Sequence, residues 1–179
     1  ARGVTSPSSP APGLVPGTGS ELGARLEREG LVFAASLWQM QVSSDLIYVG
    51  DSGAVEPAGA TRRKGYELSA NWRPRPWLNV DASWTGSHAR FVDAPGEDHV
   101  PGALESTGEL GVAAIFDGWN AALRVRHLGP HALVEDNSVR SPGTTQLNLR
   151  AAWTPRRADG GRFELYGELL NVFDTRAKD

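Results

Sequence analysis

A hairpin signal between residues 64 and 86 constrains this chain more than any other feature. On each side of a double-proline turn, apolar and polar residues alternate without a break. The apolar positions are Tyr66, Leu68, Ala70 and Trp72 before the turn and Leu78, Val80, Ala82 and Trp84 after it. Because side chains of a β-strand point alternately to its two faces, this period predicts two strands that share one apolar and one polar face. Pro74 and Pro76 fix φ and remove backbone donors, which favours a chain reversal between the strands.

The same alternation recurs along the rest of the chain. It predicts further strands at 20–28, 31–46, 105–116, 119–126, 147–154 and 163–169. The second half of 31–46 takes Trp38, Met40 and Val42 as its apolar positions. Asp117-Gly118 is a strong signal for a two-residue hairpin turn, because both positions tolerate positive φ. We therefore expect an all-β, antiparallel protein of about eight strands.

The connections between these strands alternate in length. Short turns are expected near Gly30, Pro74, Gly118 and Pro155, and long polar loops at 49–63, 92–104 and 128–143. Several strands run about 10 to 12 residues, which is enough to cross a bilayer at a tilt, whereas soluble strands average about 5 to 6. Short turns at one end and long loops at the other are typical of bacterial transmembrane β-barrels.

The distribution of aromatic and charged residues points the same way. Six large rings flank the short turns, where they would form a girdle at one membrane interface: Trp72, Trp77, Phe116, Trp119, Trp153 and Phe163. The polar positions include Glu67, Asp81, Glu109, Arg124, Arg126 and Arg150. So many charges favour a wet barrel lumen over a dry core.

Composition excludes several classes of protein. The 179 residues carry a formal charge of −3 with scattered arginines, which argues against a nucleic-acid surface. Without cysteine there is neither a disulfide framework nor a cysteine zinc site, and no motif indicates a cofactor. No apolar run suits a transmembrane helix, and the mean hydropathy of −0.34 is compatible with strands that alternate. Residues 1–19, rich in Pro, Ser and Gly, are expected to be a loop or a disordered lead-in, and the chain reads as an internal fragment or a processed product.

Three other functions remain open at this point. The first is an outer-membrane enzyme, because hydrolase and metal sites use residues such as Ser87-His88, Asp93, Glu97, Asp98 and His99. Polar loops collect such residues, however, and no second motif converges on them. His127 and His131 are interpreted as loop residues in the same way. A soluble carbohydrate-binding β-sandwich with exposed tryptophans is a second alternative, and a small eight-stranded outer-membrane barrel with a structural or adhesin role is the third.

Five motifs in order carry a resemblance to a known family. They are Leu37-Trp38 through Ile47-Tyr48-Val49-Gly50-Asp51, Arg63-Lys64-Gly65-Tyr66-Glu67-Leu68, Val100-Pro101-Gly102-Ala103-Leu104, Glu135-Asp136-Asn137-Ser138-Val139-Arg140 and Leu169-Leu170-Asn171-Val172-Phe173-Asp174. From 20 to 174 the sequence resembles the C-terminal barrel portion of a TonB-dependent outer-membrane receptor. Residues 175–179 would begin a further outer loop that is cut short.

The resemblance implies a function as well as a fold. Members form 22-stranded barrels filled by a plug domain in the outer membrane of Gram-negative bacteria. They bind scarce nutrients such as iron-siderophores or cobalamin and import them when the TonB complex acts on the plug, which this chain lacks together with the TonB box. The expected partners are outer-membrane lipid, a nutrient ligand and, through that plug, TonB. No covalent chemistry, metal or cofactor is expected. Arg124 and Arg126 are the candidate contacts for an anionic ligand in the lumen, with the loops 49–63, 92–101 and 128–142 above them.

Overall fold

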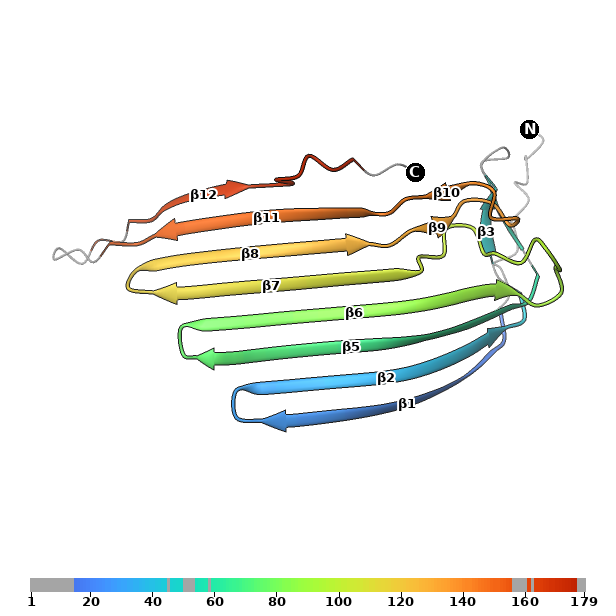
Figure 1. Ribbon diagram of the computed structural model, residues 1–179, viewed down its shortest axis with the longest axis horizontal. Helices are drawn as coiled ribbons and strands as arrows, with labels where there is room; N and C mark the ends of the chain where they lie inside the picture. Colours follow the sequence, from blue (N-terminus) through green and yellow to red (C-terminus); the bar gives the residue numbers. More distant parts are fainter. Residues whose placement is uncertain are drawn as a thin grey trace, which may run out of the picture.

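A computed structural model describes residues 15–44, 46–49, 54–57, 59–155, 161 and 163–176. Its main feature is one antiparallel sheet of eight strands, in the order β1-β2-β5-β6-β7-β8-β11-β12 (Figure 1). The strands are β1 (Gly17–Arg28), β2 (Leu31–Val42), β5 (Thr61–Arg75), β6 (Leu78–Phe91), β7 (Ser106–Phe116), β8 (Trp119–Leu128), β11 (Thr144–Trp153) and β12 (Leu165–Leu169). Two short hairpins pair β3 (Leu46–Val49) with β4 (Ala54–Pro57) and β9 (His131–Ala132) with β10 (Arg140–Ser141).

Short turns and long connections lie at opposite ends of the sheet, as predicted (Figure 1). The turn at Asp117-Gly118 has φ of 46° and 80°, the left-handed values that a tight hairpin turn of this kind requires. Gly30 has φ of 72° in the first turn, where an added Cβ would also lie 2.7 Å from the carbonyl oxygen of Arg73. Most of the turn predicted from Pro155 to Gly161, most of the lead-in 1–19, and parts of the loop 49–63 and of 175–179 lie outside the described residues.

The register brings a set of alternating apolar residues from each of the eight strands onto one face. One row across the sheet runs Val80, Val112, Leu123, Leu149 and Leu169 on β6, β7, β8, β11 and β12. No second layer covers this face within the described residues. Leu22 is 77% exposed, and the only buried apolar residues described are Ala89, Val100, Ala132 and Ala152.

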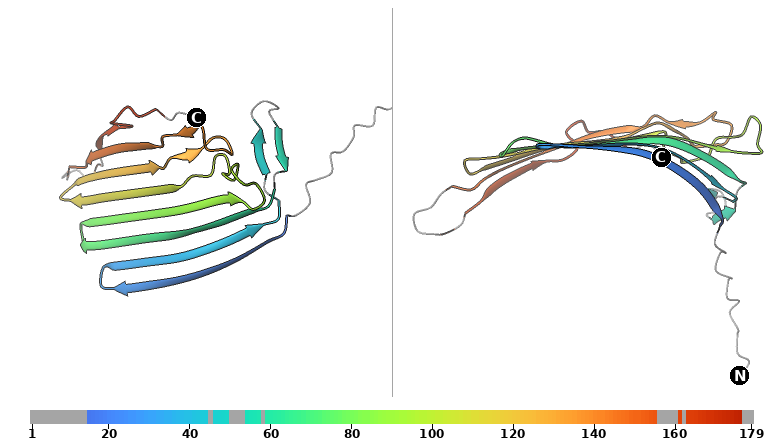
Figure 2. Two further views of the ribbon diagram at one scale, coloured as in Figure 1. Left: turned by 45° about the vertical axis from the view of Figure 1, so that its right-hand side comes forward. Right: turned by 90° about the horizontal axis from the view of Figure 1, so that it is seen from below.

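This architecture argues against the two other β folds considered above. A β-sandwich would bury the apolar face against a second sheet, whereas the described part of the chain contains one large sheet that bends into an open arc (Figure 2). A closed eight-stranded barrel would pair β1 with β12, yet these strands form the two opposite edges. The described residues contain no helix that could cross a membrane.

The prediction was wrong about the orientation of β2. Leu31, Phe33, Ala35 and Leu37 hold the apolar face, because they pair with Trp72, Ala70, Leu68 and Tyr66 of β5. Trp38 pairs instead with Glu21 and Gly65, so it lies on the polar face with Met40 and Val42. The pairing has no bulge to change the phase, and a strand's side chains alternate strictly, so the apolar residues of its second half fall on the other side.

Strand lengths also differ from the prediction. The second strand ends at Val42 rather than 46. A separate β3–β4 hairpin follows, which begins at the predicted end of that strand and extends into the predicted loop 49–63. β5 begins at Thr61 and β6 continues to Phe91, beyond the point where their alternation fades. The long strands of the middle hairpin therefore extend past the band of apolar side chains.

Aromatic side chains mark both ends of that band. Beside the short turns, Trp77 and Phe116 meet edge to face at 6.3 Å and Trp119 stacks with Trp153 at 6.0 Å, as the sequence predicted. A second aromatic row was missed: Tyr66 and Trp84 lie over Gly86 and Gly108 nearer the long connections. The rise from Trp77 to Trp84 is roughly 23 Å along the strand, at about 3.3 Å per residue. The apolar face is therefore a band between two aromatic rows.

Candidate functional site

The two arginines predicted to contact a ligand lie together on the polar face of β8. Arg124 Nη1 is 3.4 Å from Glu109 Oε2 and 3.5 Å from Asp81 Oδ2, and Arg126 Nε is 3.1 Å from Glu109 Oε1. Gly111 separates Asp81 from Arg124, and a Cβ there would lie 2.4 Å from Asp81 Oδ1. The missing side chain lets Asp81 reach across the intervening strand.

This cluster of Asp81, Glu109, Arg124 and Arg126, the polar-face quartet, carries no net charge when ionised. Its side chains are 36% to 57% exposed, so each ion pair contributes no more than about 1 kcal/mol. An anionic ligand at these arginines would compete with Glu109. The prediction overlooked that competition, although the hairpin register counted back from Asp117-Gly118 places Glu109 directly opposite Arg126.

A second ion cluster lies farther toward the short-turn end. Arg150 pairs with Glu168, which lies directly opposite it on β12, and its Nη2 is 3.7 Å from Glu164. Its guanidinium carbon also lies 4.9 Å from the centre of the Tyr166 ring. Every arginine on the polar face of β8 and β11 therefore already has a carboxylate partner.

The long connections above the quartet join into one ordered layer. Backbone bonds link His99 N to Glu135 O at 3.1 Å, Gly102 N to Ala132 O at 2.9 Å and Glu105 N to Pro130 O at 3.3 Å. These hydrogen bonds join the loop at 92–105 to the loop at 129–143. Val100 and Ala132 are buried between them at 5% and 3% exposure.

Side chains reinforce this loop layer. Arg140 Nη2 binds Glu105 Oε1 at 2.5 Å and its Nη1 binds Asn137. Asp136 accepts a hydrogen bond from the backbone N–H of Ser138 at 2.9 Å, which holds the pKa of its carboxyl below the ordinary value. The layer is therefore built largely from its own polar groups.

An open cavity of about 440 Å³ lies at the edge of the loop layer. Phe91, Asp93, Ala94, Glu97 and Glu135 line it, together with Gly59 and Ala60. Two of the acidic residues singled out in the sequence therefore meet here. Asp98 does not line the cavity; it lies 3.2 Å from His99 and 3.5 Å from Arg90.

The arrangement offers no support for hydrolase or metal chemistry. Ser87 Oγ donates to the Leu104 carbonyl oxygen at 2.5 Å, a contact that does not activate a nucleophile. Within the described residues, no group of three or more acidic, histidine or cysteine side chains could hold a metal ion. His127 is a strand residue rather than a loop residue: its ring stacks on Trp84 at 5.4 Å and its Nδ1 lies 2.9 Å from Thr145 Oγ1.

The Asn171-Val172-Phe173-Asp174 motif fastens the end of the described chain to β11. Asn171 takes φ of 51° and binds Thr175 through both ends of its amide, at 3.0 and 3.2 Å. Its backbone N–H donates to Asn148 Oδ1 at 2.8 Å, and Val172 N–H donates to the Leu147 carbonyl at 2.9 Å. The motif thus has a structural role that its sequence alone did not reveal.

A family model described as "TonB dependent receptor-like, beta-barrel" matches residues 2–172. No curated protein sequence matches the chain. Among solved structures, the ferric yersiniabactin uptake receptor FyuA from Yersinia pestis is 22% identical, with a TM-score of 0.72 over 90% of this chain and 25% of that one. The ferric preacinetobactin receptor BauA from Acinetobacter baumannii is 16% identical, with a TM-score of 0.70 over 89% and 25%.

The ferric citrate transporter FecA, in its unliganded form, is also similar, at 19% identity and a TM-score of 0.71 over 90% of this chain and 27% of that one. The chain thus spans about a quarter of the length of these three proteins. At such identities the likeness shows the fold alone: this open sheet matches an arc of a larger closed barrel.

Proposed function

The chain belongs to the TonB-dependent receptor-like β-barrel family, and on that premise we propose that it forms part of the wall of an outer-membrane receptor that imports a ferric chelate. The observation that carries the proposal is the sheet itself. One face is a continuous apolar band between two aromatic rows, and the other carries ion clusters. An arc of this kind suits a wall between lipid and a wet lumen.

The proposal orients the sheet in the outer membrane of a Gram-negative bacterium. The apolar band faces lipid, the short turns face the periplasm and the loop layer faces the outside. The Trp77–Phe116 and Trp119–Trp153 pairs then lie at the periplasmic interface, where amphipathic rings are favoured.

Two observations support the ligand class: the ligands of similar solved structures and the positive charge of two lumen-side arginines. The three similar structures named above are described as receptors or transporters of ferric yersiniabactin, ferric preacinetobactin and ferric citrate. Many ferric chelates are anions, and Arg124 and Arg126 lie together on the polar face of β8. Guanidinium groups bind carboxylates and similar oxyanions in a fixed fork geometry. We therefore keep these two residues as the proposed ligand contacts in the lumen.

In the proposed mechanism this segment does no covalent chemistry. The loop layer captures the ligand, and the arginines of the polar-face quartet exchange Glu109 for the anion as the ligand moves inward. Movement across the membrane is driven by the TonB complex acting on a plug, which belongs to the rest of the receptor.

The test uses the full-length receptor that contains this segment. A strain deleted for the receptor is supplied with ⁵⁵Fe complexed to yersiniabactin, preacinetobactin or citrate, and uptake is compared with and without the plasmid-borne gene. Uptake of at least one chelate that requires both the receptor and TonB is the expected result. Uptake unchanged by loss of the receptor for every ferric chelate would overturn the proposal, and localisation away from the outer-membrane fraction would do the same.

A further inference from the structure

The open cavity of about 440 Å³ beside the loop layer, here called the acidic cavity, is enclosed by three connections of the chain. One wall comes from the segment before β5, one from the connection after β6 and one from the loop between β9 and β10. Backbone hydrogen bonds join these segments: Val92 N donates to Ala60 O at 2.9 Å, and His99 N donates to Glu135 O at 3.1 Å. The cavity is therefore formed by the fold itself and does not need a ligand to assemble it.

The carboxylates of the acidic cavity have no cation beside them. Asp93, Glu97 and Glu135 all line it, and none of the three forms an ion pair within the described residues. The neighbouring Asp98 differs, because Arg90 Nε lies 3.5 Å from its carboxylate. When its carboxyl groups are ionised, the cavity therefore holds negative charge that no described side chain balances.

The size of the cavity decides which kind of cation it suits. A metal ion needs several oxygens within about 2.6 Å of one point, and no group of acidic, histidine or cysteine side chains in the described residues could hold one. A volume of about 440 Å³ is instead in the range of small-molecule sites. Phe91 adds an aromatic ring to the lining, and the face of such a ring attracts ammonium groups. Volume and ring, independently of the acidic residues, favour an organic ligand.

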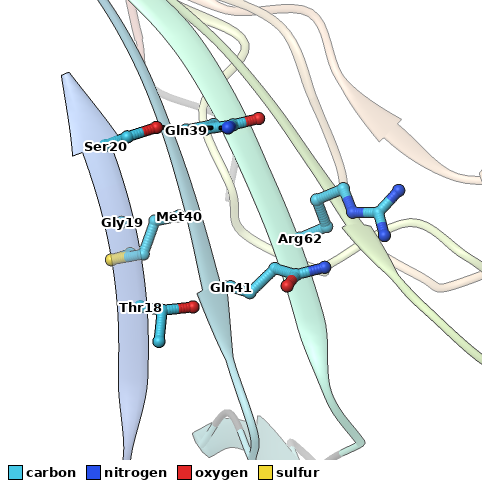
Figure 3. Close-up of a pocket in the computed structure, with 7 residues that line it drawn as sticks. All are labelled: Thr18, Gly19, Ser20, Gln39, Met40, Gln41 and Arg62. Atoms are coloured by element: carbon cyan, nitrogen blue, oxygen red, sulfur yellow. Dashed lines mark hydrogen bonds between the residues drawn. The ribbon is translucent and has the colours of Figure 1, made fainter.

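Another hollow of the sheet has the opposite charge (Figure 3). Its volume is about 400 Å³, and its polar side chains are those of Thr18, Ser20, Gln39, Gln41 and Arg62. Arg62 is the only charged residue among those that line it, so this hollow repels a cation. The acidic cavity thus differs from it in the sign of its charge rather than in its size.

The acidic cavity also lies far from the polar-face quartet. Phe91 is an even number of residues from Asp81 on β6, so both belong to the polar face. Ser83 lies in the same row as Glu109 and Arg126. From Ser83 to Phe91 the strand rises roughly 26 Å, at about 3.3 Å per residue. A compact chelate cannot contact both places at once, so a ligand arriving from outside meets the cavity first.

We propose that the acidic cavity binds a protonated amine carried by the ferric chelate. The inference rests on the import of a ferric chelate proposed above, and it names a chemical class for that ligand: a chelate with a primary ammonium group at the end of an apolar arm. The ammonium group donates hydrogen bonds to the carboxylates, and the arm packs against the Phe91 ring. This contact precedes the one proposed at Arg124 and Arg126.

The experiment uses the full-length receptor, purified in a non-ionic detergent, and two ligands that differ by one charge. One is a ferric trihydroxamate with a terminal primary amine, and the other is the same chelate with that amine acetylated. Glu97→Gln/Glu135→Gln neutralises two carboxylates of the cavity. Glu29→Gln/Asp136→Asn is the matched control, because both residues are exposed and neither lines the cavity. Isothermal titration calorimetry measures the affinities, and heat-modifiable migration on gels verifies that every variant is folded.

We expect the wild type and the control to bind the amine form about tenfold more tightly than the acetylated form, the effect of one charge-assisted contact. The cavity variant should bind both forms equally. Four results would each overturn the inference: equal binding of the two forms by the wild type, binding of neither, a preference that survives in the cavity variant, or equal loss of preference in both double variants. A cavity-dependent preference in a receptor that imports no ferric chelate would uphold amine binding and sink only the import proposal. Import of ferric chelates without any preference for the amine would sink the inference alone.

Discussion

Glu109 sets the availability of both arginines in the proposed lumen site, because Arg124 and Arg126 share its two carboxylate oxygens. In Glu109→Gln both guanidinium groups lose the Glu109 charge, so Arg126 has no carboxylate partner among the described residues and Arg124 keeps only Asp81. We expect a several-fold gain in affinity for an anionic ferric chelate, and a change in stability below about 1 kcal/mol because the pairs are exposed. Ligand titration of the full-length receptor by intrinsic tryptophan fluorescence measures the affinity.

The matched control is Glu164→Gln, which weakens the other ion cluster and leaves Arg150 paired with Glu168. It should not change the affinity. If Glu109→Gln and Arg124→Gln/Arg126→Gln both bind the chelate like wild type, the two arginines are not ligand contacts.

Gly108 is constrained by packing, because the Trp84 ring covers it and leaves no room for a side chain. An added Cβ would lie 2.4 Å from that ring, which also stacks on His127. Gly108→Ala should displace the ring and destabilise the barrel by about 1 to 3 kcal/mol, the usual cost of overpacking. Gly167→Ala is the control, since no atom of the described residues lies within 4 Å of a Cβ at that position. Urea unfolding in detergent micelles compares the two, and equal midpoints would contradict the proposed role of the glycine.

At the scale of strands, the hairpins were predictable and the phase of one strand was not. Asp117-Gly118 defined its turn from local chemistry alone. The double proline predicted the second hairpin, but its turn lies at Pro76-Trp77, and Pro74 belongs to β5 at the register shift between Trp72 and Arg75. For β2, two apolar stretches of opposite phase meet at Leu37-Trp38, and only the register with β5 decides which of them joins the apolar band. The full length of β6 was missed for a related reason: the alternation fades after Gly86, whereas the strand continues to Phe91 through pairing with β5.

The candidate site was also only partly predictable from the sequence. The sequence placed Arg124 and Arg126 on one face because their spacing is two residues, and the structure keeps them together. It did not reveal the loop layer, since the contacts between 92–105 and 129–143 join backbone groups far apart in the chain. Backbone hydrogen bonds of that kind leave no side-chain pattern to read.

The turn after β12 depends on Asn171, which supplies both a left-handed backbone conformation and side-chain hydrogen bonds. Asn171 adopts φ of 51°, and its amide binds Thr175 at both ends. Asn171→Ala loses both, whereas Asn171→Gly keeps the backbone freedom and loses only the amide bonds. We expect faster hydrogen exchange at the Val172 amide, which bonds to Leu147, with the alanine variant changed more than the glycine variant. Equal exchange in the two variants would mean that left-handed strain contributes nothing there.

At the scale of the whole molecule, the decisive property is that no described residue packs on the apolar face of the sheet or pairs with the outer side of either edge strand. Leu22, Leu37 and Leu169 are 77%, 63% and 62% exposed, and β1 and β12 each pair on one side only. Exposed apolar faces and open edges drive association in water. We therefore expect the isolated segment 15–176 to aggregate when diluted from urea into buffer, and to regain β-structure only when detergent covers the band. Sedimentation and circular dichroism with and without detergent measure this. A soluble monomer with native-like β-signal in plain buffer would require a second layer over the apolar face, and would contradict the assignment of that face to lipid.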